Sequence, residues 1–508
     1  MIGRLVLRHL AQRPVRSLVF VGAYAAGVGV MLSLLAIGEV MVAQARDEAW
    51  IGGGDLTVLP AGVDLETLKL GGAVFFGIEQ ARFLAREVLG GPRLAGDVAA
   101  VAPWLDDRAL YLHPQSGGPP TVLRVQGLIP SAARSLGAAP DLLDGTFEDH
   151  AADCRWLRPT PLELYTEIDG FHLPPTSVRG DTTWAEWHYF NLLWPDEGRW
   201  LTLSFILAGD VTGSRFGGLV LARYRTPDGR DRVYSDTVSA DAIEFAPGSA
   251  DVRFGRHSVR LGGEPAGYRV QANLPGDGGG LSVAIDIEPL PHRYFPAADI
   301  ADSDSIVSGY VVPALRARAR GRVCLDGACR DAAGAVGYHD HNWGTWGDAT
   351  AGGRVTWDWG AVHAGDFDLL YGGLGGAAAE ARRAGFRFLA YVVDSLGVAA
   401  ILEPQALRYS GDRHIAVAGR SIVIPERLDF TAARGLDTLR AEARLSHVSA
   451  SPAGARTYFL QAQGTMRLTG TLGGRALDEQ GPGFFETYVQ PTGHPALTPR
   501  HDSSGAMR

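Results

Sequence analysis

The chain has 508 residues, of which 46% are hydrophobic and 20% are charged, and its formal net charge is −9. This length and composition predict a folded protein of two or three domains and exclude an intrinsically disordered chain. The acidic balance, with no basic stripe beyond the N-terminus, predicts no nucleic-acid partner. Lys69 is the only lysine, which excludes Schiff-base chemistry downstream of it.

Residues 1–48 are basic at first and then apolar. Four arginines, Arg4, Arg8, Arg13 and Arg16, precede an uncharged run over 17–38. As a helix, about 22 residues span about 33 Å, which is enough to cross a bilayer. We therefore expect a retained transmembrane helix, with a cleaved signal peptide and a buried helix as the alternatives. The positive-inside rule then predicts a single-pass protein with a cytoplasmic N-terminus and its main body on the extracytoplasmic, periplasmic side.

Residues 49–155 are expected to form a small mixed α/β segment. It contains a strand-like run, DLTVLP (55–60), a helical stretch, GIEQARFLAREVLGG (77–91), and a second strand-like run, TVLRVQGLI (121–129). A basic single span followed by GGGDLTVLPAG (52–62) resembles the start of FtsX-like and macrolide-exporter-type ABC permeases. That resemblance implies an extracytoplasmic domain and ABC transporter subunits as partners. Because no second apolar span follows, we expect a membrane anchor with a domain that is a remnant of such a permease or was acquired from one, and we expect no export activity.

From Trp184 onward, short strand-like runs alternate with Asp-Gly, Pro-Asp and Gly-Gly turn signals. Strands that recur at about 8–12 residues are typical of all-β barrels and sandwiches. Two tandem β units fit the length better than one large barrel, so the fold class is mainly β. The expected division is 1–48 for the basic N-terminus and transmembrane helix, 49–155 for the permease-like segment, 160–347 and 348–490 for two β domains, and 491–508 for a disordered tail. A further helical run is expected at AAAEARRAG (377–385).

The stretch CLDGAC contains two of the three cysteines. If Asp326 and Gly327 form a two-residue type I′ turn, which Asp-Gly favours, Cys324 and Cys329 lie opposite each other on paired strands. Side chains at such a position approach closely enough for a disulfide. The sequence leaves open whether they form one or remain two packed thiols.

The densest cluster of chemically versatile residues is GYHDHNWG (337–344). In a strand, period-2 alternation places His339, His341 and Trp343 on one face and Asp340 on the other. A His-x-His pair on a strand can chelate zinc, and His363 is then the nearest candidate for a third ligand. The alternatives are buried side chains satisfied by backbone groups, or a ligand pocket; we expect a pocket, with no metal.

Four motifs carry a family resemblance: WAEWHYFNL (184–192), GYHDHNWG (337–344), WDWG (357–360) and GPGFFETY (481–488). In this order they resemble the carotenoid 1,2-hydratase (hydroxyneurosporene synthase) family and its AttH-type relatives, over about residues 160–490. One departure is His188, where the first motif often has a second aromatic residue. The resemblance implies two tandem lipocalin-like units with a hydrophobic pocket at or near their contact. The ligand-binding residues that it implies are Glu186, Trp187, Tyr189, Trp343, Trp357, Trp359 and Glu486.

The chemistry of hydration narrows the catalytic candidates. Adding water to an isolated alkene requires a proton delivered to carbon, and water then captures the resulting carbocation; no cofactor is needed. The acid must stay protonated near neutral pH, which favours a carboxyl group in an apolar site. Asp358, between two tryptophans, is the first candidate and Asp340 is its rival. The faces of Trp343 and Trp359 would stabilise the cation, and His341, beside His339, would position the water or take its proton.

Two functions follow from the sequence. The first is a membrane-anchored enzyme, a hydro-lyase similar to carotenoid 1,2-hydratase, acting on a long apolar isoprenoid or polyene. The second is a non-catalytic lipid or isoprenoid carrier associated with an ABC transporter. In both cases the expected partners are a hydrophobic small molecule (a carotenoid, isoprenoid or lipid) and the membrane.

Overall fold

The computed structural model describes residues 14–45, 56, 58, 78–115, 117–137, 148–213, 215–276, 279–302, 307–345, 355–376, 388–417, 419–454 and 457–489. Most of the predicted strand 55–60, the helical run 377–385 and the tail 491–508 lie outside these residues. The chain divides into two compact units. One comprises Met1–Ala85 and Ala99–Asp153, and the other comprises Arg86–Val98 and Cys154–Arg508.

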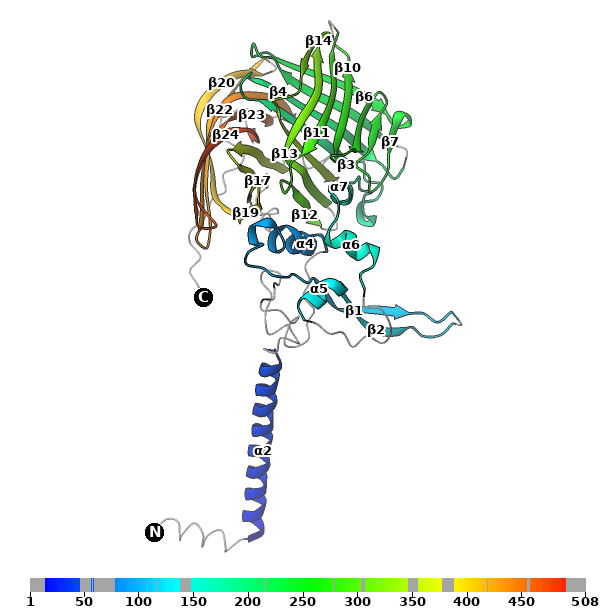
Figure 1. Cartoon of the computed structure of the whole chain (residues 1–508), viewed down its shortest axis with the longest axis vertical. Helices are drawn as coiled ribbons and strands as arrows, with labels where there is room; N and C mark the ends of the chain where they lie inside the picture. The colour runs from blue at the N-terminus through cyan, green and yellow to red at the C-terminus, as the bar shows by residue number, and fades with distance from the viewer. Residues whose placement is uncertain are drawn as a thin grey trace. The chain divides into compact units, whose positions relative to one another are not determined.

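The first long element is the helix α2 (Pro14–Ala45), drawn in dark blue in Figure 1. Its part Pro14–Leu35 has a mean hydropathy of 2.2 and is not buried. By length and composition this part is able to cross a membrane, although a signal sequence near the N-terminus has the same properties. The predicted apolar helix is therefore confirmed as a helix, and its length and composition fit a membrane anchor or a signal sequence.

The mixed segment contains short helices and one hairpin. The predicted helical stretch is confirmed as α4 (Ile78–Phe83) followed by a π-helical turn, η2 (Leu84–Leu89). The predicted strand over 121–129 is β2 (Thr121–Leu128), which pairs with β1 (Trp104–Leu112) in an antiparallel sheet. The other short helical elements are η3 (Pro92–Leu94), α5 (Pro130–Ser135), α6 (Ala151–Leu157), α7 (Pro161–Ile168), η4 (Thr176–Val178) and η5 (Ala240–Ala242).

In the described part of the chain, thirteen strands form the first large sheet, in the order β6-β5-β4-β3-β15-β13-β11-β10-β9-β8-β7 with β12 and β14 also paired to β13 (Figure 1). All of its strand pairs are antiparallel. The bounds are β3 (Trp184–Trp194), β4 (Arg199–Asp210), β5 (Arg215–Arg225), β6 (Asp231–Ser239), β7 (Ile243–Phe245), β8 (Val252–Phe254), β9 (His257–Gly262), β10 (Gly267–Leu274), β11 (Leu281–Pro289), β12 (Phe295–Asp302), β13 (Val307–Leu325), β14 (Ala328–Asp331) and β15 (Val336–Thr345).

The second sheet has nine strands in the described residues, in the order β19-β18-β17-β16-β24-β23-β22-β21-β20. The bounds are β16 (Val355–Ala364), β17 (Phe367–Gly376), β18 (Leu389–Asp394), β19 (Gly397–Leu402), β20 (Pro404–Val417), β21 (Arg420–Arg434), β22 (Asp437–Gly454), β23 (Thr457–Leu472) and β24 (Arg475–Val489). The prediction of a mainly β fold with two successive lipocalin-like units, an N-terminal helix and a small mixed segment is confirmed.

The four sequence motifs occupy the first and last strands of the two sheets. In the first sheet β3 pairs with β15, and in the second β16 pairs with β24. Each pair joins strands that are more than a hundred residues apart in the chain, so each brings the beginning of its sheet beside its end. The motifs therefore lie on two strand pairs inside these sheets, where the first and last strands of each sheet in chain order lie side by side.

The CLDGAC turn forms as the sequence predicts. Asp326 and Gly327 have positive φ values of 51° and 81°, which is the type I′ conformation. Cys324 pairs with Cys329 across the β13–β14 hairpin, and the two form a disulfide. The structure thus decides between the two alternatives that the sequence left open.

Candidate functional site

The paired strands β3 and β15 present different chemistry on their two faces. On one face, His341 lies opposite His188 and Trp343 lies opposite Glu186. On the other face, Asp340 lies opposite Tyr189. The predicted alternation of His339, His341 and Trp343 against Asp340 is therefore confirmed, and it separates the motif residues into two groups on opposite sides of one strand pair.

The first group, here called the Asp169 cluster, consists of Asp169, His172, Glu186, His188, His339 and His341. Asp169 directly follows α7, a helix that begins with a capping box: Thr160 Oγ1 accepts a hydrogen bond from the Glu163 N–H, and the Glu163 carboxylate accepts one from the Thr160 N–H. The next residue, Gly170, packs against the backbone of Gly248 so closely that a Cβ atom would lie 2.6 Å from a carbonyl carbon. This close approach fixes Asp169 beneath the two strands.

The histidines of the cluster converge on two carboxylates. His339 Nε2 is 3.1 Å from Asp169 Oδ2, and His341 Nδ1 is 2.6 Å from Asp169 Oδ1. The other nitrogen of His341, Nε2, is 3.0 Å from Glu186 Oε1, which His172 Nδ1 also contacts at 2.9 Å. Except for the half-buried His172, all of these side chains are buried. Trp343 covers the cluster by stacking on the His172 ring at 3.8 Å between centroids.

The electrostatics of the cluster favour an ionic core. Burial opposes the charged form of His341, but its hydrogen bonds and charge interactions with Asp169 and Glu186 prevail and raise its pKa to about 9. Burial likewise opposes ionisation of Asp169, yet the neighbouring histidines hold its pKa well below the usual value. Burial, together with the charge of His341, lowers the pKa of His188 well below its usual value. His341 is thus the cationic member and His188 is neutral.

The second group lies on the other face of β3 and β15 and centres on Asp340 and Glu486. Asp340 accepts hydrogen bonds from the Tyr338 hydroxyl at 2.7 Å and from the Asn342 amide at 2.6 Å. Glu486, on β24, accepts hydrogen bonds from Trp357 Nε1 at 3.1 Å and from Gln461 Nε2 at 3.0 Å. We call these two residues, with Tyr189, Tyr338, Trp357, Trp359 and Phe484, the inter-sheet group.

Direct contacts join the two sheets at the inter-sheet group. Trp359 Nε1 donates to the Tyr338 hydroxyl at 3.0 Å, and the Tyr338 ring packs edge-on against Phe484 at 4.8 Å between centroids. Burial raises the pKa of Asp340 to about 8; the hydrogen bond from Tyr338 opposes this rise, and the nearby charge of Glu486 adds to it. Burial also raises the pKa of Glu486. Asp340 therefore favours the protonated form near neutral pH, and burial shifts Glu486 in the same direction.

Asp358 belongs to neither group. It is buried in the second sheet, where its carboxylate accepts a hydrogen bond from the Tyr409 hydroxyl. Burial raises its pKa to about 6, and hydrogen bonds from Thr487 and Tyr409 partly oppose the rise. Its neighbours Trp357 and Trp359 point instead towards Glu486 and Tyr338, as expected for alternating residues of a strand.

The structure does not bring together the residues that the sequence grouped around Asp358. The expected site combined Asp358 as the acid with Trp343, Trp359 and His341, whereas these residues belong to three different environments. Trp343 and His341 lie with the Asp169 cluster, Trp359 lies in the inter-sheet group, and Asp358 faces the interior of the second sheet. The reason is the strand period of two, which sends sequence neighbours to opposite faces.

His363 does not join the histidines of the first sheet. Its Nδ1 is 2.8 Å from Asp368 Oδ1 in the second sheet, and burial lowers its pKa. Asp368 also forms ion pairs with Arg293, which precedes β12, and with Arg316 on β13 of the first sheet. The proposed third ligand is thus part of a buried ion network between the two sheets.

Two members of the Asp169 cluster were missed by reasoning from the sequence, namely Asp169 and His172. The capping box at Thr160 and Glu163, with Pro161 at the first helical position, was a readable signal for a helix ending just before Asp169. No local signal links that helix end to a strand about 170 residues later. His188 was noticed as a departure from the motif, and its position opposite His341 explains why an imidazole stands there.

One hollow of the described surface lies away from both groups of residues. It has a volume of about 240 Å³ and is lined by residues of both sheets, including Arg225, His447 and Gln463. None of the residues predicted to bind ligand lines it.

No family model matches the sequence, and no curated protein matches it. Solved structures are similar at a low level. A protein assigned as AttH from Nitrosomonas europaea has a TM-score of 0.42 and 14% identity, covering 63% of this chain and 98% of that one. The structure of CghA with Sch210972 has a TM-score of 0.44 and 16% identity, and the match covers 65% of this chain and 96% of CghA. Kievitone hydratase from Nectria haematococca has a TM-score of 0.38 and 11% identity, and the match covers 63% of this chain and 91% of the hydratase. Similarity at this level assigns neither a family nor an activity to the chain.

Proposed function

We propose that the chain is a hydro-lyase similar to carotenoid 1,2-hydratase, which adds water to a C=C bond of a long apolar isoprenoid or polyene. The observation that carries the proposal is a buried carboxyl group, Asp340, that lies within an aromatic shell and whose pKa is raised by burial and by the charge of a second buried carboxyl group, Glu486. Asp340 is the proton donor in this scheme. The four sequence motifs, which place both residues in matching positions, support the same reaction class.

The environment of the carboxyl pair explains why it suits acid catalysis. Among the ion pairs of the described residues, none involves Asp340 or Glu486. Burial of Asp340 and the nearby charge of Glu486 outweigh the opposing charge of His341, so Asp340 retains its proton near neutral pH. A neutral carboxylic acid in such a site is able to protonate an alkene carbon, which a solvated carboxylate cannot do.

The proposed reaction is balanced without a cofactor. The π electrons of the alkene take the Asp340 proton, leaving a tertiary carbocation and the Asp340 carboxylate. The faces of Tyr338, Trp359 and Phe484 stabilise that cation. A water oxygen then bonds to the cation and its surplus proton passes to the carboxylate pair, through Glu486, which restores the neutral acid. The sum is one water added to one double bond.

The test is turnover of an acyclic carotenoid by the purified full-length chain in ¹⁸O-labelled water, followed by mass spectrometry. We expect a labelled hydration product from the wild type. Asp340→Asn and Glu486→Gln should each lower kcat by at least about 100-fold, the usual contribution of a positioned acid or base. Asp478→Asn is the matched control, because Asp478 is exposed on the same strand as Glu486 in an ion pair with Arg467.

The other outcomes assign the function differently. Loss of turnover in Asp358→Asn alone would move the acid to the second sheet. If carotenoid or lipid binds to the wild type but is recovered without the label, the proposed reaction is overturned. That outcome would favour the second function, a non-catalytic lipid or isoprenoid carrier that associates with an ABC transporter at the membrane.

A further inference from the structure

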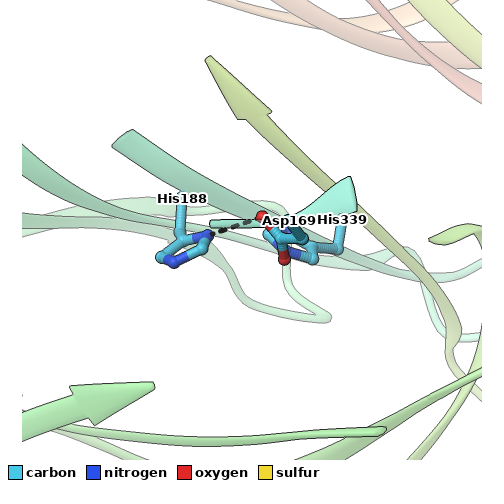
Figure 2. A group of neighbouring side chains, drawn as sticks. All are labelled: Asp169, His188 and His339. Atoms are coloured by element: carbon cyan, nitrogen blue, oxygen red, sulfur yellow. Dashed lines mark hydrogen bonds and ion pairs between the residues drawn. The ribbon is translucent and has the colours of Figure 1, made fainter. Parts of the chain in front are cut away.

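Three ligand atoms from separate parts of the chain converge inside the first sheet. They belong to Asp169, which follows α7, to His188 on β3 and to His339 on β15 (Figure 2). His339 Nε2 lies 3.1 Å from Asp169 Oδ2, and His188 Nδ1 lies 3.9 Å from Asp169 Oδ1. Across the three residues, the ligand atoms all lie within 4.8 Å of one another, and all three side chains are buried.

The hydrogen bonds of His339 fix which of its nitrogens carries a proton. Its Nδ1 is 3.0 Å from the carbonyl oxygen of Tyr189. A carbonyl oxygen only accepts hydrogen bonds, so Nδ1 carries the hydrogen. In a neutral ring the other nitrogen, Nε2, then presents its lone pair. In that form Nε2 is able to bind a metal ion together with Asp169, whereas without a metal ion it carries a second hydrogen to bond the Asp169 carboxylate at 3.1 Å.

His188 repeats the arrangement with its nitrogens exchanged. Its Nε2 is 2.9 Å from the carbonyl oxygen of Ala250, so Nε2 carries the hydrogen and Nδ1 presents the lone pair. The Nδ1 atom is buried and has no hydrogen-bond partner. Figure 2 shows the His188 ring turned so that this nitrogen faces Asp169.

His341 neutralises Asp169 on one side, with its Nδ1 2.6 Å from Asp169 Oδ1. The buried His188 Nδ1 still has no partner, and a cation between it and Asp169 would supply one. The outward N–H group of each histidine donates to a backbone carbonyl, which is the support usually found behind metal-binding histidines. We propose that Asp169, His188 and His339 bind a divalent transition-metal ion of the zinc type.

The geometry suits such an ion. Zinc–nitrogen and zinc–oxygen bonds of about 2.0–2.2 Å in a tetrahedral arrangement place ligand atoms roughly 3.3–3.5 Å apart. The separations of 3.1 and 3.9 Å bracket that value. Two histidines and one carboxylate leave a coordination position for a further ligand, as in three-ligand zinc sites and in two-His-one-carboxylate iron sites. The site lies on the opposite face of β15 from Asp340, so this inference is independent of the proposed reaction.

The test is metal binding by the purified full-length chain. We expect elemental analysis of the wild type to find a bound transition metal, and Zn²⁺ to raise the thermal unfolding temperature after chelation. Co²⁺ should give a visible d–d spectrum of nitrogen and oxygen coordination. His188→Gln, His339→Gln and Asp169→Asn should each weaken Zn²⁺ binding by at least about 100-fold, beyond the usual effect of losing an outer partner.

The matched control is His257→Gln. His257 is also buried in the first sheet and lies 3.0 Å from a carboxylate, Asp236, but its other nitrogen accepts the Asn273 N–H and so has a partner. This variant should bind Zn²⁺ as the wild type does. A wild type that neither carries nor binds Zn²⁺ or Co²⁺, or unchanged binding in His188→Gln and His339→Gln, would overturn the proposal. Circular dichroism verifies that each variant is folded.

Discussion

At the scale of single residues, the neighbours Asp340 and His341 illustrate how one peptide bond separates two electrostatic environments. Asp340 faces aromatic rings and another carboxyl group, so burial favours its neutral form. His341 faces two carboxylates, which favour its charged form despite equal burial. Both pKa values are raised, but for the aspartate this removes a charge and for the histidine it keeps one.

Asp358 gives a prediction at this scale, because its raised pKa links folding to pH. Its pKa is about 6 in the folded chain and 3.8 when unperturbed. The folded state therefore holds the proton more tightly, and stability is complete below about pH 4 and is lost as pH rises through about 6. The difference corresponds to about 3 kcal/mol. Asp358→Asn should remove this dependence, as measured by urea unfolding of both proteins between pH 4 and pH 7.

The control for this experiment is Asp478→Asn, which alters an exposed carboxyl group in the same sheet. Its unfolding curve should follow the wild type at every pH. If the wild type and Asp358→Asn respond in parallel to pH, the buried carboxyl group does not titrate as argued here.

At the scale of elements, the strands β3, β13 and β15 position the Asp169 cluster through close packing. Trp343 lies opposite Gly309 of β13 in the sheet register. A Cβ atom on Gly309 would lie 2.3 Å from the Trp343 indole, far inside contact distance. The absence of a side chain at Gly309 therefore allows the indole to lie over the sheet and stack on His172.

Gly309→Ala should destabilise the protein for this reason. Overpacking of a well-packed interior lowers the free energy of unfolding by about 1–3 kcal/mol. The Trp343 indole is unable to move away from the new methyl group without losing its stacking contact with His172. Gly262→Ala, in β9 of the same sheet, is the control because a Cβ there meets nothing within 4 Å. It should be neutral or slightly stabilising, by up to about 1 kcal/mol. Urea unfolding measures both, and equal effects of the two substitutions would contradict the role given to Gly309.

At the scale of the whole molecule, two observations bear on where the chain resides. Pro14–Leu35 is long and apolar enough to span a membrane, and the Cys324–Cys329 disulfide is typical of proteins outside the reducing cytoplasm. Together they support the proposed orientation, with the N-terminus in the cytoplasm and the two β units on the extracytoplasmic side.

Cys154 offers a direct test of this orientation. It is the remaining cysteine and is exposed, while the other two are in the disulfide. We expect a membrane-impermeant maleimide to label the chain in intact spheroplasts, and the labelled chain to stay with the membrane fraction after a carbonate wash. Cys154→Ser should remove the label. Labelling only after lysis would place the β units in the cytoplasm, and release of the full-length chain by the wash would contradict the anchor.

The sequence by itself determined the features that depend on near neighbours in the chain. Alternation with period two predicted the strands and the faces of GYHDHNWG, because a strand sends successive side chains to opposite sides. The Asp326–Gly327 turn followed from backbone preference, and the apolar helix over Pro14–Leu35 followed from composition.

Only the tertiary structure decided which faces meet. Asp169, at the end of α7, contacts His339 on β15, and the charge of Glu486 on β24 of the second sheet acts on Asp340 on β15 of the first; the members of each pair are more than a hundred residues apart. Their meeting depends on the number, twist and register of all the intervening strands, which no local pattern encodes. For the same reason Asp358, which lies between Trp357 and Trp359 in the sequence, is far from His339 and His341 in its contacts, although the sequence analysis had grouped them in one site.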